Sequence, residues 1–114
     1  MKQRNVYILK TPGFYKIGIA ADIQKRLRTL RTGNPFGIEV VFSAPVYDAY
    51  GIESKLHRQF KNKRKSGEWF ALTDDEAQLA KALLRAYADG EPKPGFQLSF
   101  KNLLRRVWNY QRDY

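Results

Sequence analysis

The chain of 114 residues is long enough for one compact core, and a domain of this size buries roughly two-thirds of its unfolded surface. Lys and Arg outnumber Asp and Glu by 21 to 11, and the formal net charge of +10 favours polyanionic partners, above all nucleic acid. The absence of cysteine excludes disulfides and thiolate metal sites, and no apolar run approaches the roughly 20 residues that cross a bilayer. The polar start also lacks the apolar core of a signal peptide, so we expect a cytoplasmic, intracellular protein with no membrane partner.

The first elements that the sequence predicts are a β-hairpin and a helix. Residues 4–10 and 14–20 are rich in β-branched and aromatic side chains, and Thr11-Pro12-Gly13 between them is typical of a turn. Asp22 can cap a helix that ends near Gly33. The apolar residues of this helix recur at helical spacing, at Ile23, Leu27 and Leu30.

A third strand and a second helix are expected next. Residues 38–46 alternate in character and end their pairing at Pro45, which predicts a strand. Residues 49–63 predict a helix that packs through Ile52, Leu56 and Phe60. Glu53 and His57 are four residues apart on this helix and therefore share a face.

The remainder of the chain predicts a third helix and a basic extension. Thr73 and Glu76 fit a capping box for a helix that runs to about residue 89. Residues 91–98 are rich in Pro and Gly and predict a connector, and 99–112 predict a short helix. We expect a domain over residues 1–90 and a C-terminal helical extension over 91–114 that packs on it, with dimerisation or contact to a nucleic-acid backbone as alternatives.

Five short motifs carry a resemblance to a known family. Asn5-Val6-Tyr7 and Lys16-Ile17-Gly18 lie on the two hairpin strands, Arg26 lies on the first helix, and Glu53 lies on the second, before Glu68-Trp69-Phe70. In this order the motifs resemble those of the GIY-YIG endonuclease superfamily, in particular its compact branch typified by small phage proteins. The resemblance spans about residues 5–72. Asn5 replaces the first glycine of the family pattern and Lys16 replaces the second tyrosine, and the second change alters the chemistry.

The resemblance implies an α+β fold with a three-stranded antiparallel sheet flanked by helices. It also implies a metal-dependent endonuclease that hydrolyses DNA phosphodiester bonds by a one-metal mechanism. Glu53 is then the ligand of Mg²⁺ or Mn²⁺, because a hard cation accepts one carboxylate together with water and substrate phosphate. Such a catalyst needs a base for water, positive charge for the crowded phosphorus and help for the leaving oxygen.

The expected catalytic residues are Tyr7, Lys16, Arg26, His57 and Glu53. Tyr7 is expected to accept the proton of the attacking water, because a phenol near cations can ionise below its ordinary pKa of about 10. Lys16 would lower that pKa or hold a phosphate oxygen, and the planar guanidinium of Arg26 suits two phosphate oxygens. His57 would protonate the leaving oxygen or orient the metal's water. Each could instead be an ordinary strand or helix side chain.

The sequence pattern also predicts roles for two neighbours of these residues, Tyr15 and Glu68. Strand alternation places Tyr15 on the opposite sheet face from Lys16, as a core or surface aromatic. Glu68 is interpreted either as a hydrogen-bond acceptor or neighbour of the metal, or as a structural anchor beside Trp69 and Phe70.

Further basic residues are expected to contact phosphates without reading sequence. These residues are Lys25, Arg28, Arg31, Lys61, Lys63, Arg64 and Lys65. DNA is the expected partner, and a homodimer, a nucleoid location or a role in a phage-infected cell stays open. The alternative function is a non-catalytic DNA- or RNA-binding module whose nuclease site the Lys16 replacement has degraded, and a weaker alternative is a protein-interaction role on a nucleoprotein.

Overall fold

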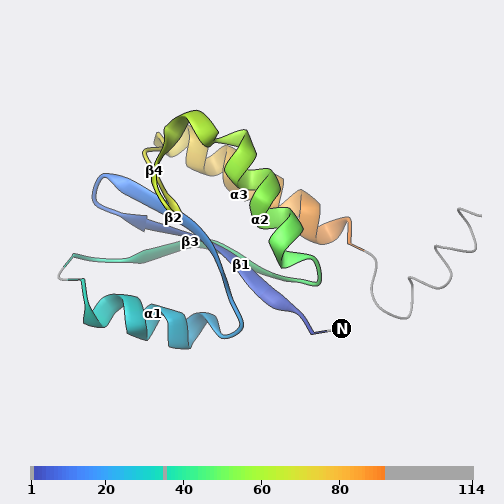
Figure 1. Ribbon diagram of the computed structural model, residues 1–114, viewed down its shortest axis with the longest axis horizontal. Helices are drawn as coiled ribbons and strands as arrows, with labels where there is room; N and C mark the ends of the chain where they lie inside the picture. The colour runs from blue at the N-terminus through green and yellow to red at the C-terminus, as the bar shows by residue number, and fades with distance from the viewer. Residues whose placement is uncertain (1, 35, 92–114) are drawn as a thin grey trace, which may run out of the picture.

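The computed structural model describes residues 2–34 and 36–91. They form an α+β fold in which one sheet separates α1 from the pair of α2 and α3 (Figure 1). The bounds are β1 Arg4–Thr11, β2 Phe14–Ala20, α1 Ile23–Thr32, β3 Glu39–Val46, α2 Ala49–Gln59, the 3-10 turn η1 Lys61–Lys63, β4 Arg64–Ser66, β5 Trp69–Phe70 and α3 Asp74–Asp89. The expected extension over 92–114 lies outside the described residues.

The sheet has five antiparallel strands in the order β3-β1-β2-β5-β4, and not the three strands that the sequence predicted. The expected strands are present as β1, β2 and β3. The additional strand β4 lies among the basic residues that were expected to contact phosphates, at Arg64–Ser66, and β5 lies at Trp69–Phe70. They are three and two residues long, and a pattern of period 2 cannot be recognised over so short a run.

The tight turn of the first hairpin fixes how β1 and β2 face each other. Thr11 pairs with Phe14, and Gly13 adopts a φ of 87°, which glycine tolerates without steric cost. Counting back from this turn, Leu9 pairs with Lys16 and Tyr7 with Gly18. Because directly paired residues of antiparallel strands share a face, Lys16 lies on the same face of the hairpin as Tyr7.

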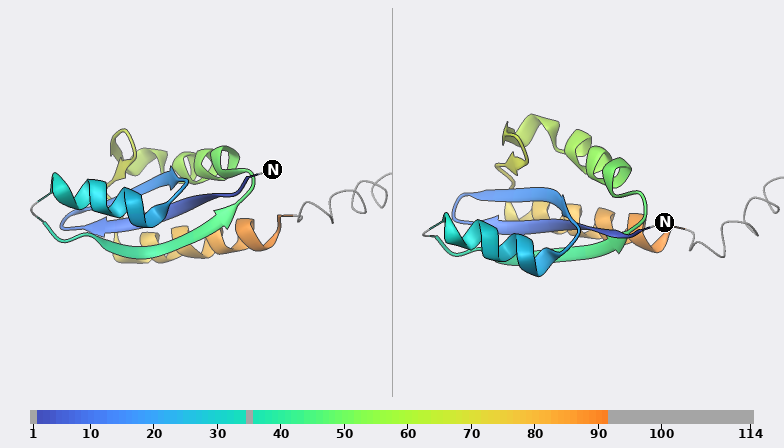
Figure 2. Two further views of the ribbon diagram at one scale, coloured as in Figure 1. Left: turned by 90° about the horizontal axis from the view of Figure 1, so that it is seen from below. Right: turned by 60° about the horizontal axis from the view of Figure 1, so that its bottom comes forward.

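Two cores lie on the two faces of the sheet. α1 covers the smaller core, which consists of Tyr7, Leu9, Ala20, Leu27 and Ile38. α2 and α3 cover the larger core, which includes Val6, Ile8, Tyr15, Ile17, Ile52, Leu56, Phe70, Ala80 and Leu84. Figure 2 shows α1 and α3 on opposite sides of the strands. The predicted opposite orientation of Tyr15 is confirmed, since its ring lies in the larger core and its hydroxyl donates a hydrogen bond to Asp74.

Side chains close the first turn of each helix. The Asp22 and Asp48 carboxylates accept hydrogen bonds at 3.1 Å from the backbone N–H of Lys25 and Gly51, at the starts of α1 and α2. The predicted capping box of Thr73 and Glu76 is confirmed at the start of α3.

A further carboxylate joins the end of α3 to the start of α2. Glu91 accepts hydrogen bonds at 2.8 Å from the backbone N–H of both Tyr47 and Asp48. This contact links segments that are 43 and 44 residues apart in the chain. Over residues 2–34 and 36–91, no helix is long and apolar enough to span a bilayer.

Candidate active site

Tyr7 lies at the centre of the sheet with its hydroxyl directed at Gly18. The residue is fully buried, and its Oη has no hydrogen-bond partner among the described residues. A Cβ atom on Gly18 would lie 2.5 Å from Tyr7 Oη and 2.7 Å from Tyr7 Cζ, closer than any real contact. Only glycine at position 18 therefore leaves space for the phenol in this position.

Glu68 approaches the same point from the loop before β5. Its Oε2 also lies 2.5 Å from the position that a Gly18 Cβ would take, so this oxygen and Tyr7 Oη are at most twice that distance apart. The backbone carbonyl of Glu68 accepts a hydrogen bond from Ile17 N at 3.0 Å. The backbone of β2 thus fixes the place from which the Glu68 side chain reaches the phenol.

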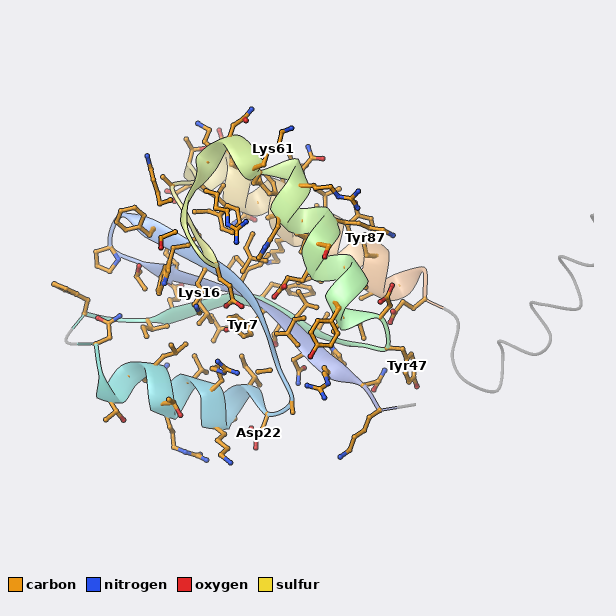
Figure 3. The ribbon with its side chains drawn as sticks, in the orientation of Figure 1. Tyr7, Lys16, Asp22, Tyr47, Lys61 and Tyr87 are labelled. Carbon is orange, nitrogen blue, oxygen red and sulfur yellow. The ribbon has the colours of Figure 1, made fainter. Side chains whose placement is uncertain are left out.

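Lys16 is occupied by two partners. Its Nζ lies 3.0 Å from Glu68 Oε2 and 4.9 Å from the centroid of the Trp69 ring. The Lys16 side chain is only 12% exposed, so solvent screens this ion pair less than a surface pair. Figure 3 shows Lys16 and Tyr7 near each other at the centre of the sheet. The ammonium is therefore directed at a carboxylate and lies beside an aromatic ring.

The pKa of Tyr7 moves in the opposite direction from the one expected from sequence. Burial raises it from its ordinary value of 10.0 to about 12, and the charge of Glu68 adds to the rise. Glu53 raises this pKa further, whereas Arg26 lowers it. Lys16 was expected to lower it, but its ammonium is paired with Glu68 instead. Tyr7 is consequently a neutral phenol at physiological pH.

Glu53 lies on α2 within the electrostatic influence of the other candidate groups. Burial is the largest cause that raises the pKa of its carboxyl group, and the charge of Glu68 raises it further. His57, Lys16 and Arg64 lower this pKa. The sequence predicted Arg64 only as a phosphate contact. In the structure its charge also acts on the Glu53 carboxylate.

His57 fixes α2 to the sheet. Its Nε2 lies 2.9 Å from the carbonyl oxygen of Ile17, and an N–H at this position donates to that acceptor. The imidazole also packs against Phe70, with ring centroids 5.0 Å apart. Since Ile17 N is bonded to Glu68, one residue of β2 connects the loop that carries Glu68 to the helix that carries Glu53.

The remaining predicted cations lie on two exposed segments. Arg26, Lys25, Arg28 and Arg31 are exposed on α1, and Lys61, Lys63, Arg64 and Lys65 are exposed in η1 and β4. Three members of these groups have partners within the protein that the sequence did not suggest. Arg31 donates to the Ile38 carbonyl at 3.4 Å, Arg64 Nε donates to the Gly67 carbonyl at 2.5 Å, and Lys63 lies 3.7 Å from Glu76.

The donors at this site suit a hard, partly hydrated cation better than a zinc ion. Within residues 2–34 and 36–91, no group of three or more His, Asp or Glu side chains is arranged to hold a metal. Magnesium requires less, because one or two carboxylates suffice when water and substrate phosphates complete its octahedron. Glu53 is the carboxylate that would provide such an oxygen ligand, and burial raises the pKa of its carboxyl group.

Comparison with known proteins identifies one family. No curated protein and no solved structure matches the chain significantly. The model of the T5orf172 domain matches residues 4–86, which include the complete sheet, α1, α2 and most of α3. This family is phage-associated and is related to nuclease-like folds. The chain therefore belongs to the T5orf172 domain family.

Proposed function

We propose that this protein is a metal-dependent endonuclease of the GIY-YIG type that hydrolyses DNA phosphodiester bonds. The observation that carries the proposal is the arrangement around Gly18. There a buried phenol, which has no hydrogen-bond partner in the described part of the chain, and a carboxylate approach the same point. A second carboxylate on α2 lies within the electrostatic influence of both. The net charge of +10 and the relation of the family to nuclease-like folds support nucleic acid as the substrate.

The proposed roles follow from burial and charge. Arg26 is exposed on α1 and remains charged at every working pH, so its guanidinium would bind two oxygens of the scissile phosphate. The neutral phenol of Tyr7 would donate a hydrogen bond to the attacking water or to a phosphate oxygen. His57 would position Glu53, because its Nε2 is bonded to the Ile17 carbonyl.

Glu53 would hold Mg²⁺ or Mn²⁺ next to the phosphate. The bound cation supplies positive charge that offsets the charge of the phosphorane-like transition state. Partial burial of Glu53 leaves fewer water molecules to compete for its oxygens, which strengthens an interaction with a divalent ion.

The exposed cations of α1 and of the segment from Lys61 to Lys65 would hold the DNA backbone. Each phosphate that they neutralise releases counterions and adds about 0.9 to the slope of log affinity against log salt concentration. Because these contacts read the backbone alone, we expect binding with little sequence preference.

Plasmid nicking tests the proposed activity. Supercoiled plasmid is incubated with the wild-type protein and with Mg²⁺ or Mn²⁺, and the conversion to nicked circles is measured. Arg26→Ala should lower the rate by about 10²- to 10³-fold, as the loss of one preorganised charged donor does elsewhere. Arg85→Ala is the matched control, because Arg85 lies on α3 over the Phe42 ring, on the other side of the sheet from α1. Equal nicking by wild type and Glu53→Gln with every metal would contradict the proposal.

A second function, a non-catalytic DNA- or RNA-binding module, is favoured by one observation. The Lys16 ammonium, which stands in place of a tyrosine in the family pattern, is paired with Glu68 and shielded from solvent. In such a module the exposed cations of α1 and of the segment from Lys61 to Lys65 would still contact the nucleic-acid backbone. Gel shifts by wild type that are accompanied by no nicking above the level of Glu53→Gln would identify this module.

A further inference from the structure

We propose that Tyr50 and Arg4 form a binding subsite for one unpaired nucleotide of the DNA, next to the phosphate that is cut. The Tyr50 ring stacks on the unpaired base, and the Arg4 guanidinium binds a phosphate of the same strand. The inference rests on the proposed function, because it takes DNA as the substrate and Glu53 as the residue beside the cut. It adds the substrate class, which is DNA with unpaired nucleotides at the site of cleavage.

Tyr50 is a large aromatic residue that lies outside both cores. It belongs to the first turn of α2 and is 65% exposed, whereas Ala49, Ile52 and Leu56 of the same helix are buried. The guanidinium of the exposed Arg4 lies over its ring, with Cζ 5.9 Å from the ring centroid. An exposed pair of this kind adds little to the stability of the fold, so the ring is available to a ligand.

The position of Tyr50 on α2 places it in line with the candidate site. At about 100° per residue, Tyr50 lies about 20° from His57 and about 60° from Glu53 around the helix axis. At a rise of about 1.5 Å per residue, Glu53 is about 4.5 Å from Tyr50 along this axis. The three residues therefore form one row on α2, and Glu53 lies between the other two.

The strands place Arg4 at the matching end of this row. His57 contacts Ile17 of β2, and Ala20, three residues further along this strand, lies opposite the residue that follows Arg4. Three strand residues span about 10 Å, as do the seven helix residues from Tyr50 to His57. Figure 1 shows the start of α2 beside the start of β1. The candidate carboxylate on α2 is thus flanked by two contacts to the strands, one from His57 and one from Tyr50.

The charge at the two ends of α2 suits a nucleic-acid strand that passes Glu53. The exposed cations of η1 and β4 follow the C-terminal end of this helix, and the exposed Arg4 lies at its N-terminal end. A guanidinium binds phosphate oxygens in a bidentate manner and stays charged at every working pH. A strand that lies along α2 therefore meets positive charge on both sides of the proposed cation ligand.

The exposed aromatic ring selects an unpaired base over a paired one. In a duplex the neighbouring bases cover both faces of each base, so an aromatic side chain stacks on a base that has left the helix. Such stacking tolerates any base, because every base has a π-face. The subsite therefore recognises the structure of the DNA and not its sequence.

Gel shifts test the subsite separately from cleavage. The probes are a fully paired duplex and the same duplex with a short single-stranded gap, and EDTA prevents cutting. Tyr50→Ala should weaken binding to the gapped probe by about 5- to 150-fold, as the loss of one base stack does elsewhere, and should leave binding to the paired probe unchanged. Tyr50→Phe keeps the ring and should bind both probes like the wild type.

Phe36→Ala is the matched control, because Phe36 is 64% exposed but lies between α1 and β3. It should keep the wild-type ratio of affinities for the two probes. A 2-aminopurine base in the gap reports the contact itself, since stacking quenches its fluorescence. Wild type and Tyr50→Phe should quench it, and Tyr50→Ala should quench it less.

Each of the other outcomes decides between the two proposals. Equal binding of the gapped probe by Tyr50→Ala and wild type would overturn the subsite, and so would an equal loss in Phe36→Ala. A loss in Tyr50→Ala that is the same for both probes would identify a contact to the duplex and overturn the role of the unpaired base. Wild type that prefers the gapped probe through Tyr50 but nicks no DNA with any metal would support the subsite and overturn the nuclease. Wild type that binds neither probe would overturn both.

Discussion

The replacement of Gly18 by alanine tests the central contact of the candidate site. The new methyl group would lie 2.5 Å from Glu68 Oε2, 2.5 Å from Tyr7 Oη and 2.7 Å from Tyr7 Cζ. Glu68 is partly exposed and can rotate away, whereas Tyr7 is fully buried in the smaller core and cannot move without repacking it. The cost therefore comes from the tyrosine, and overpacking of this kind destabilises by about 1–3 kcal/mol.

Thermal and urea unfolding measure this cost. In a domain of this size, each kcal/mol of lost unfolding free energy lowers the unfolding midpoint by about 4 °C. We therefore expect the midpoint to decrease by about 4–12 °C. Gly37→Ala is the matched control, because a Cβ atom at Gly37 would meet nothing within 4 Å and its φ is not positive. Adding Tyr7→Phe to Gly18→Ala removes the contact to Oη and should restore part of the stability. A Gly18→Ala protein that unfolds like the Gly37→Ala control would refute the described position of the phenol.

Further predictions concern three individual side chains. Tyr7→Phe should keep or increase stability by up to about 1 kcal/mol, because it removes a buried hydroxyl that has no hydrogen-bond partner within residues 2–34 and 36–91, and it should abolish nicking. Because the pKa of Tyr7 is raised from 10.0 to about 12 in the folded protein, the fold loses stability as the pH rises from 10 toward 12, and Tyr7→Phe should flatten this alkaline loss in unfolding experiments. Thr73→Ala should cost about 1 kcal/mol in urea unfolding through loss of the capping box, and an unchanged midpoint would contradict that role. The pKa of Asp74 is lowered by hydrogen bonds from Tyr15 and Lys10, so its contribution is present above pH 3.8 and lost as the pH falls through the lowered pKa; Asp74→Asn should remove this part of the acid dependence.

Local signals in the sequence account for the parts of the fold that were predicted. The turn at Gly13, the cap at Asp22 and the box at Thr73 act within a few residues, and the corresponding elements are present. β5 depends instead on pairing with β2, which lies more than 50 residues earlier in the chain. Its two residues, Trp69 and Phe70, carry no periodic pattern that could reveal this pairing.

The residues of the candidate site were proposed from the sequence, but their electrostatics could not be predicted from it. Counting back from the hairpin turn places Tyr7 opposite Gly18 from sequence alone, and this signal could have identified the close approach. The depth of burial that raises the Tyr7 pKa depends on how α1 covers the sheet. The pairing of Lys16 with Glu68 depends on β5, which the sequence did not reveal, so the ammonium was expected to act on the phenol.

The bond between Glu91 and the start of α2 has a consequence for where the folding unit ends. The family match stops at residue 86, yet the carboxylate that satisfies two backbone N–H groups at Tyr47 and Asp48 lies five residues later. A polypeptide shortened to the matched region would lose these two hydrogen bonds together with the last residues of α3. The turn into the helix that bears Glu53 would then loosen, so the boundary of an autonomously stable protein lies at or beyond Glu91.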